Sequence, residues 1–249
     1  MVFNFYGFLI SLGILLSTFV SKKVKTSLPA KFSFLKLSVF DAFPWVIIFA
    51  LLGARAYHVV DYWDYYAKDL IQALYLWQGG MGIFGGIVGG ILGLWFFTLK
   101  NKLGKKEFLS FLDLIAISLP LGQAIGRWGN FLNQELYGLP TSLPWGIFIR
   151  FENRLPLWES FTHFHPLFLY ESLGSFIIFA VLLYIIRSKF YRKYGFVFFL
   201  YLLLYSCLRF FLEFLRIESW QISGFRVNQL VSLGLMLVSI FSILKLNKS

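Results

Sequence analysis

Long apolar runs alternate with short polar segments along the whole chain. Several of these runs approach the roughly 20 residues that an α-helix needs to cross a bilayer. The pattern predicts an all-α integral membrane protein with seven transmembrane helices. The predicted spans cover residues 3–20, 39–60, a glycine-rich run that begins after Trp77-Gln78, 108–125, a run opened by His165-Pro166, 196–216 and 227–244.

The composition supports this class. Hydrophobic residues make up 58% of the 249 residues and charged residues only 14%, more apolar surface than a soluble core of this size needs. The single cysteine, Cys207, excludes an internal disulfide and a cysteine metal cluster. We expect no metal and no cofactor.

The formal net charge of +11 indicates how the chain is oriented in the membrane. Basic residues gather in alternate loops, as expected for the cytoplasmic side of a membrane protein; these loops lie at residues 22–36, 100–106 and 187–193, and further lysines close the chain. This distribution argues against a nucleic-acid partner. It predicts an N-terminus outside and a C-terminus in the cytoplasm, with residues 1–249 forming a single polytopic membrane domain and about 139–164 forming a small external head.

The fourth apolar run leads into a stretch, residues 126–138, that is unusually polar for a membrane edge. Arg127, Asn130 and Gln134 are spaced so that a continuing helix would put them on one face. Ionisable groups at membrane depth are costly and usually face a cavity or a partner. A simpler interpretation is an Arg–Glu pair that closes the end of a helix.

Other charged residues lie inside the predicted spans. We expect Arg55 to pair with a carboxylate and Asp113 to pair with an arginine of a neighbouring helix. The sixth span carries one polar stripe on an apolar helix, made of Tyr205, Arg209, Glu213 and Arg216.

The third span is dense in glycine. Gly80-x-Gly82-x-x-Gly85 matches a dinucleotide fingerprint in letters only, because no strand precedes it and no acidic residue follows about 20 positions later. Repeated glycines instead permit close helix packing in lipid. Alternatively, backbone near residues 79–86 lines a slot for a lipid head group.

Together these arginines indicate a ligand. Arg127, Arg209 and Arg55 are expected at the outer half of the bundle, and guanidinium forks match phosphate oxygens. An anionic phospholipid head group is the natural ligand, and charge neutralisation would also favour its departure as a leaving group. The spacing alone leaves a transferase, a hydrolase and a lipid carrier open.

A family resemblance narrows this choice. The residues that carry it most specifically are Gly126-Arg127-x-Gly129-Asn130-Phe131-x-Asn133-x-Glu135-x-x-Gly138. This stretch resembles the signature of bacterial prolipoprotein diacylglyceryl transferases. The resemblance implies seven spans in the bacterial cell membrane, and transfer of the diacylglyceryl group of phosphatidylglycerol to the cysteine thiol of a prolipoprotein lipobox, with release of glycerol phosphate.

The resemblance also implies site residues. We expect catalytic roles for Arg127, Arg209, Tyr205, Glu135 and Asn130. We expect substrate-binding roles for Tyr6, Arg55, Gly80, Gly85, Gly138, Glu213, Arg216 and His165.

Two positions depart from the family pattern. Phe84 stands where the family commonly has a histidine, the obvious general base, and Phe168 stands where it usually has a glutamine. Either the base lies elsewhere, with His165 as a candidate, or arginine-stabilised thiolate suffices, or the activity is altered. The alternative function is a non-catalytic or altered-acceptor protein that binds anionic phospholipid.

The Phe84 departure generates a prediction. A general base contributes about 10²–10⁴-fold to a rate. If proton transfer is impaired in this chain, Phe84→His will raise the rate of transfer from phosphatidylglycerol to a lipobox peptide in membranes by about tenfold or more. An unchanged rate would place the base elsewhere.

Overall fold

The computed structural model describes residues 5–75, 80–191, 193–217, 219, 221–222 and 224–248, without the side chains of residues 6, 83, 84, 222, 247 and 248. The chain divides into two compact units. The first comprises residues 1–28 and 112–249, and the second comprises residues 29–111.

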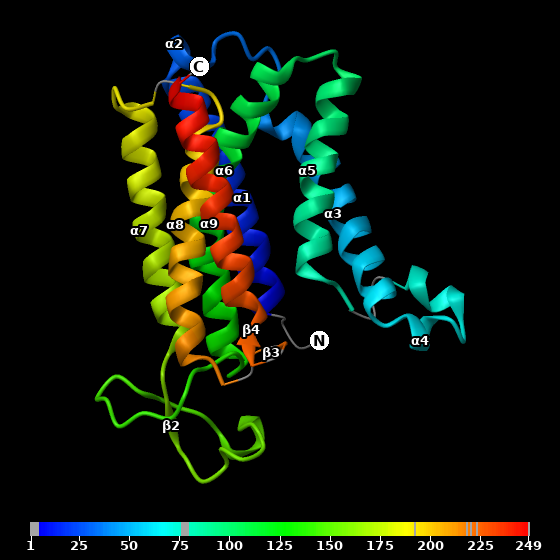
Figure 1. Ribbon diagram of the computed structural model, residues 1–249, viewed down its shortest axis with the longest axis vertical. Coiled ribbons are helices and arrows are strands. Elements are labelled where there is room, and N and C mark those ends of the chain that lie inside the picture. Colours follow the sequence, from blue (N-terminus) through cyan, green and yellow to red (C-terminus); the bar gives the residue numbers. More distant parts are fainter. Residues whose placement is uncertain are drawn as a thin grey trace. The chain divides into compact units, whose positions relative to one another are not determined.

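The first unit is a bundle of long helices with a small head at one end (Figure 1). Its helices are α1 (Phe5–Ser27), most of α6 (Lys105–Leu132), α7 (Leu167–Arg187), α8 (Phe196–Leu212) and α9 (Val227–Lys248). Helix α8 packs against both α7 and α9. A short 3₁₀ helix, η4 (Glu213–Leu215), and a hairpin of β3 (Gln221–Ile222) and β4 (Phe225–Arg226) connect α8 to α9.

Small residues bring α1 and α6 into close contact. A Cβ on Gly13 would lie only 3.1 Å from the carbonyl oxygen of Gly122, so the two backbones nearly touch. The hydroxyl of Ser21 donates to the carbonyl of Leu114 at 2.8 Å and lies 2.7 Å from the hydroxyl of Ser118. Small side chains and interhelical hydrogen bonds are typical of helices that pack within a membrane.

Asp113 caps the beginning of α8. Its carboxylate accepts hydrogen bonds from the backbone N–H groups of Gly195 and Phe198, at 2.7 and 2.8 Å, and from the Tyr191 hydroxyl at 3.0 Å. The first turn of a helix has unsatisfied N–H groups, which attract a carboxylate. The expected arginine partner of Asp113 is therefore wrong, because backbone donors satisfy this buried side chain.

The head follows α6 and has little regular structure. Strands β1 (Ile147–Phe148) and β2 (His163–Phe164) pair antiparallel, and a 3₁₀ helix, η3 (Phe151–Asn153), lies between them in the chain. Tyr137, Ile149 and Phe164 form its small core. The Tyr137 hydroxyl donates to the carbonyl of Asn153, which fixes the signature stretch against the head.

The second unit is built on a pair of helices, α3 (Val39–Asp61) and α5 (Ile83–Lys100). A capping box at Ser38 and Asp41 begins α3. Short elements complete the unit, namely α2 (Pro29–Phe32), α4 (Trp63–Tyr66) and the 3₁₀ helix η1 (Leu70–Leu74).

Glycines set the spacing between α3 and α5. A Cβ on Gly85 would lie 2.1 Å from the carbonyl oxygen of Gly53, and one on Gly89 would lie 2.1 Å from that of Phe49. These distances are too short for any side chain. The prediction that the glycine run permits close helix packing is confirmed.

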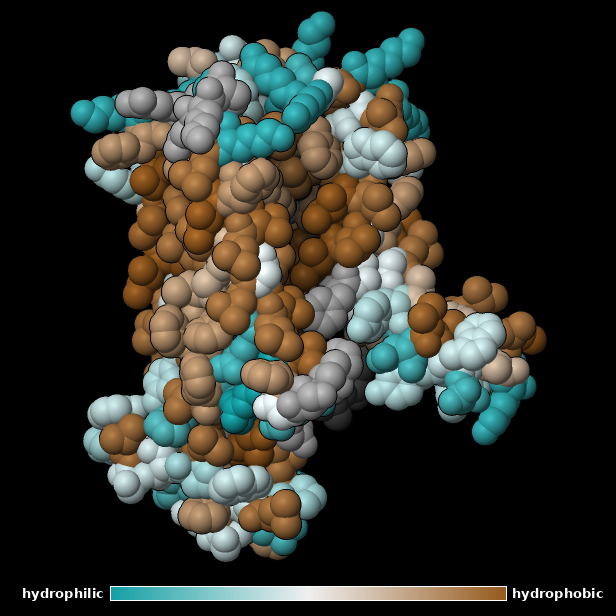
Figure 2. Space-filling view, in the orientation of Figure 1, coloured by the Kyte–Doolittle hydropathy of each residue, from teal (hydrophilic) through white to brown (hydrophobic). Residues whose placement is uncertain are grey.

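Six helices of the described residues are long and apolar enough to cross a membrane, and a shorter apolar helix covers Gly85–Lys100. The bundle of the first unit is hydrophobic at mid-height and hydrophilic at both ends (Figure 2). One predicted end was wrong, because helix α6 continues to Leu132, beyond the expected end at residue 125. The sixth span ends within one residue of the expected position, since the apolar helical segment runs from Phe196 to Leu215 with η4 as its last turn.

The packing of α3 against α5 predicts different outcomes for two adjacent glycines. Gly85→Ala will lower the free energy of unfolding by about 1–3 kcal/mol, because the new methyl group overlaps the Gly53 backbone. Gly86→Ala will be neutral or stabilising, because its Cβ would lie 3.6 Å from the nearest atom and alanine favours a helix. Unfolding in detergent micelles measures both, and equal effects would contradict this packing.

Candidate functional site

Three helix ends meet on the head side of the first unit. Arg127 lies in the last two turns of α6, Glu171 in the first two turns of α7 and Arg209 in the last turn of α8. At 1.5 Å per residue, each lies within about 8 Å of the end of its helix. The predicted convergence of Arg127 and Arg209 is therefore present in the structure.

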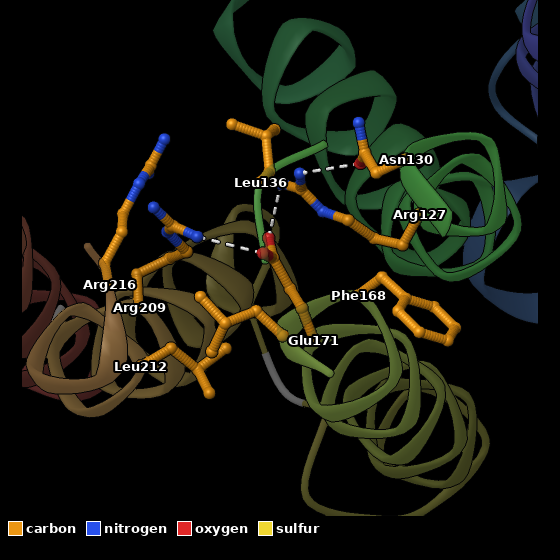
Figure 3. Close-up of a pocket in the computed structure, with 9 residues that line it drawn as sticks. Arg127, Asn130, Leu136, Phe168, Glu171, Arg209, Leu212 and Arg216 are labelled. Atoms are coloured by element: carbon orange, nitrogen blue, oxygen red, sulfur yellow. Dashed lines mark hydrogen bonds and ion pairs between the residues drawn. The ribbon is translucent and has the colours of Figure 1, made fainter. Parts of the chain in front are cut away.

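A single carboxylate, that of Glu171, lies between the two arginines (Figure 3). Its Oε1 is 2.6 Å from Nη2 of Arg127, and its Oε2 is 2.9 Å from Nη1 of Arg209. The Tyr205 hydroxyl also donates to Oε1, at 2.8 Å. Only 4% of the Glu171 side chain is exposed, so these donors stabilise a charge that would be costly without them.

A second buried carboxylate, Glu213, follows at the end of α8. Its Oε2 is 3.5 Å from Nη2 of Arg209 and 3.9 Å from Nη1 of Arg216. Its Oε1 accepts hydrogen bonds from Ser219 and Asn228. Burial and the nearby Arg209 lower the pKa of the Arg216 guanidinium from its ordinary value.

The chain of contacts also extends into the signature stretch. Arg127 Nη1 donates to Oδ1 of Asn130 at 3.3 Å, and Asn130 Nδ2 donates to Oε1 of Glu135 at 2.8 Å. Asn130 and Glu135 thus hold one side of the Arg127 guanidinium. Gln134 does not share this face as expected, because α6 ends at Leu132.

Strain marks the turn after α6. Gln134 and Leu136 have φ angles of +52° and +54°, in the left-handed region that non-glycine residues rarely adopt. The Gln134 side chain instead binds the head, where its Oε1 accepts from the backbone N–H of Arg150 and from Nδ2 of Asn153. Such strain persists where surrounding contacts enforce it, and it is common at functional sites.

A cavity lies between these side chains. Charged groups line one side of it and apolar groups the other, the latter being Leu136, Leu167, Phe168 and Leu212. It encloses about 20 Å³, about the room for one water molecule. A phosphate could enter only if the side chains move apart. The cavity combines cations with an apolar wall, as a lipid head group requires.

Gly138 and His165 belong to the frame of the site. The backbone N–H of Gly138 donates to the carbonyl of His165, and a backbone bridge pairs Gly138 with Arg216. A Cβ on Gly138 would lie 2.8 Å from the carbonyl oxygen of Leu215, so only glycine permits this approach. The His165 ring lies 3.2 Å from the Tyr170 hydroxyl.

Arg55 belongs to the second unit. It donates to the carbonyls of Gln72, Ala73, Tyr75 and Gly80, and its guanidinium lies 5.1 Å from the centroid of the Tyr66 ring. Arg55 thus holds the segment after α4 in place, and its pairing with a carboxylate stays a prediction. Gly80 has a φ of +72° and lies directly against this side chain.

Several predicted residues remain untested. The side chains of Tyr6 and Phe84, and residues 77–79, lie outside the described part of the chain. Phe168 is described, and its ring stacks on Phe131 with centroids 4.7 Å apart. It completes the apolar wall of the cavity and offers no hydrogen-bonding group there.

Glu171 is the residue that sequence reasoning did not assign to the site. Its signal was available, because it is an acidic residue near the start of an otherwise apolar helix. Among the described residues, no group of three or more His, Cys, Asp or Glu side chains could hold a metal ion. The ion pairs of the site join three arginines, Arg127, Arg209 and Arg216, to two buried carboxylates, Glu171 and Glu213. This excess of positive charge favours an anionic ligand.

Comparisons with known proteins bear on the family of this chain. A family model described as prolipoprotein diacylglyceryl transferase matches residues 1–245. The chain is 39% identical to the phosphatidylglycerol–prolipoprotein diacylglyceryl transferase of Finegoldia magna, over 98% of this chain and 91% of that protein. It is 41% identical to the protein of the same name from Fervidobacterium nodosum, over 94% and 78%. It is 40% identical to the protein of that name from Trichormus variabilis, over 92% of this chain and 80% of that protein.

The shared carboxylate predicts a stability effect. Glu171→Ala will lower the free energy of unfolding by about 3 kcal/mol, because two arginines lose their common partner. Glu159→Ala, an exposed carboxylate in the head, will change it by less than about 0.5 kcal/mol. Unfolding in detergent micelles measures both. Equal stabilities would mean that Glu171 does not hold the cluster together.

Proposed function

The chain belongs to the prolipoprotein diacylglyceryl transferase family, and we propose that it transfers the diacylglyceryl group of phosphatidylglycerol to the lipobox cysteine of prolipoproteins. Glycerol phosphate is the second product. The observation that carries this proposal is the convergence of Arg127 and Arg209 on one point beside an apolar wall. That arrangement suits a lipid phosphate whose acyl chains remain in the bilayer.

The reaction exchanges one bond for another. The acceptor thiol loses its proton, and the sulfur attacks the glyceryl carbon that carries the phosphate. A carbon–sulfur bond forms as the carbon–oxygen bond breaks, and the electron pair remains on the phosphate oxygen. Glycerol phosphate therefore leaves with one more negative charge than it carried in the lipid.

The arginines act on that developing charge. Fixed cations aimed at a leaving group stabilise the transition state more than the ground state. We assign this role to Arg127 and Arg209, with Asn130 and Glu135 orienting Arg127 and Tyr205 orienting Glu171. Donor binding requires Glu171 to give up part of its hold on both guanidinium groups, because its carboxylate occupies the space between them.

The acceptor thiol must also lose its proton. A cationic site lowers the pKa of a bound thiol and so favours the thiolate. Arg127, Arg209 and Arg216 supply that environment without a histidine at position 84. Neither a metal nor another cofactor has a role in this scheme.

The membrane arrangement is part of the proposal. In the first unit, the basic ends of α1, α7 and α9 lie at the end of the bundle away from the head. By the positive-inside rule that end is cytoplasmic, so the head and the site face the outside of the bacterial inner membrane. Helix α5 supplies the seventh span, and the N-terminus lies outside.

The remaining substrate-binding assignments follow from the same scheme. Glu213 and Arg216 extend the charged cluster, while Gly138 and His165 maintain its frame. Arg55, Gly80 and Gly85 lie in the second unit. Together with Tyr6 they remain proposed substrate-binding residues. The names of the relatives favour an enzyme over a non-catalytic lipid-binding protein, and no nucleic acid is expected as a partner.

The proposal predicts a specific loss of activity. Arg127→Ala will reduce transfer from phosphatidylglycerol to a lipobox peptide by about 10²–10³-fold, the usual effect of removing one group that stabilises developing charge. Arg187→Ala is the matched control, because this arginine is exposed at the far end of α7 and lies outside the site. It will retain full activity.

The measurement uses purified protein in vesicles that contain phosphatidylglycerol, with lipidated peptide and released glycerol phosphate both quantified. The two products should appear in equal amounts. The proposal fails if the natural sequence transfers nothing, or if Arg127→Ala transfers at the full rate.

A further inference from the structure

A second cavity lies next to the phosphate site, and we propose that it is the subsite for the glycerol phosphate head group of the donor lipid and of the leaving product. This inference rests on the proposed function. The cavity encloses about 350 Å³, within the range of small-molecule sites. Its lining is Asn133, Gln134, Glu135, Leu136, Tyr137, Asn153, Leu155 and Arg216.

The two cavities share a wall. Leu136 and Arg216 line both of them, so a molecule could contact both spaces at once. The second cavity lies between the turn after α6 and the segment of the head that begins in η3. The distal glycerol of a lipid phosphate held at Arg127 and Arg209 would extend in this direction.

Backbone pairing fixes this wall. Gly138 bridges to Arg216, and the N–H of Leu139 donates to the carbonyl of Leu215 at 2.8 Å. These pairs join the turn after α6 to the end of η4. The left-handed conformation of Leu136 then directs its side chain between the cavities. The wall between the cavities is therefore held by specific backbone contacts, since its backbone is both hydrogen-bonded and strained.

Arg216 is the cation best placed to serve the second cavity. Its nearest described carboxylate oxygen, Oε2 of Glu213, is 3.9 Å away, whereas Arg127 and Arg209 each have a Glu171 oxygen within 2.9 Å. Figure 3 shows its guanidinium beside that of Arg209 and directed away from Glu171. It could therefore bind a phosphate oxygen without first breaking a short ion pair.

The rest of the lining suits a neutral polyol. Amide groups of Asn133 and Asn153 and the carboxylate of Glu135 can donate to or accept from two hydroxyls. A site built around hydroxyl hydrogen bonds discriminates strongly against a ligand that lacks them, so the cavity would select glycerol.

Two donor lipids of equal charge test this selection. Phosphatidylglycerol carries two head-group hydroxyls and one carbon that phosphatidylethanol lacks, and each lipid is presented in vesicles with a lipobox peptide. The natural sequence will prefer phosphatidylglycerol by about tenfold or more in kcat/KM. Asn133→Leu and Asn153→Leu will each reduce that preference at least threefold, while their rates with phosphatidylethanol stay within twofold.

Glu152→Leu is the matched control. This residue lies in the same η3 turn as Asn153 but does not line the cavity, so the preference will be unchanged. Asn153→Leu also removes a hydrogen bond to Gln134, whereas Asn133→Leu leaves that bond intact and removes instead a long one, of 3.4 Å, to Glu135. Agreement between the two asparagine variants therefore separates loss of the subsite from disturbance of the head.

Direct binding provides a readout that does not need turnover. Glycerol phosphate will raise the Tm of the natural sequence in detergent micelles more than inorganic phosphate at the same concentration, and both asparagine variants will lose the difference. Equal effects of the two anions would overturn the subsite, as would transfer with an unchanged donor preference in both variants. Binding that follows the asparagines without any transfer would instead refute the proposed function and leave a glycerol phosphate site.

Discussion

The site depends on one carboxylate held between two guanidinium groups. Arg127 and Arg209 come from helices far apart in the sequence, and without Glu171 their charges would repel each other in a medium that screens poorly. Glu171 therefore holds the two guanidinium groups in register. Under the proposed function it also competes with the lipid phosphate for the same donors. The ion pairs that stabilise the free protein would then oppose binding of the donor lipid through this one side chain.

The sequence predicted the elements whose signals are local. Apolar length predicted the long helices, glycine spacing predicted the contact between α3 and α5, and unusual charge at membrane depth predicted that Arg127 and Arg209 serve a common site. Each of these depends on a cost that can be read from the residues themselves. Burying an arginine is costly wherever it occurs, so its presence in an apolar run requires a partner.

The partners themselves were harder to predict. Asp113 and Arg55 both proved to satisfy backbone groups, and a sequence carries no record of which N–H or carbonyl will lie nearby in the fold. The polar stripe of the sixth span was easier, because Arg209 and Arg216 both contact Glu213 and Tyr205 contacts the Glu171 partner of Arg209, although the helix tightens into a 3₁₀ turn at Glu213. The strained turn at Gln134 was unpredictable, since contacts with the head enforce it.

The backbone bridge between Gly138 and Arg216 has a consequence for donor binding. It ties the turn that carries Leu136, in the wall between the two cavities, to the backbone of Arg216, so a shift of either backbone strains the other. A donor lipid that fills both cavities would therefore meet one continuous wall instead of two independent loops, and its phosphate and its distal glycerol would be positioned by the same piece of backbone.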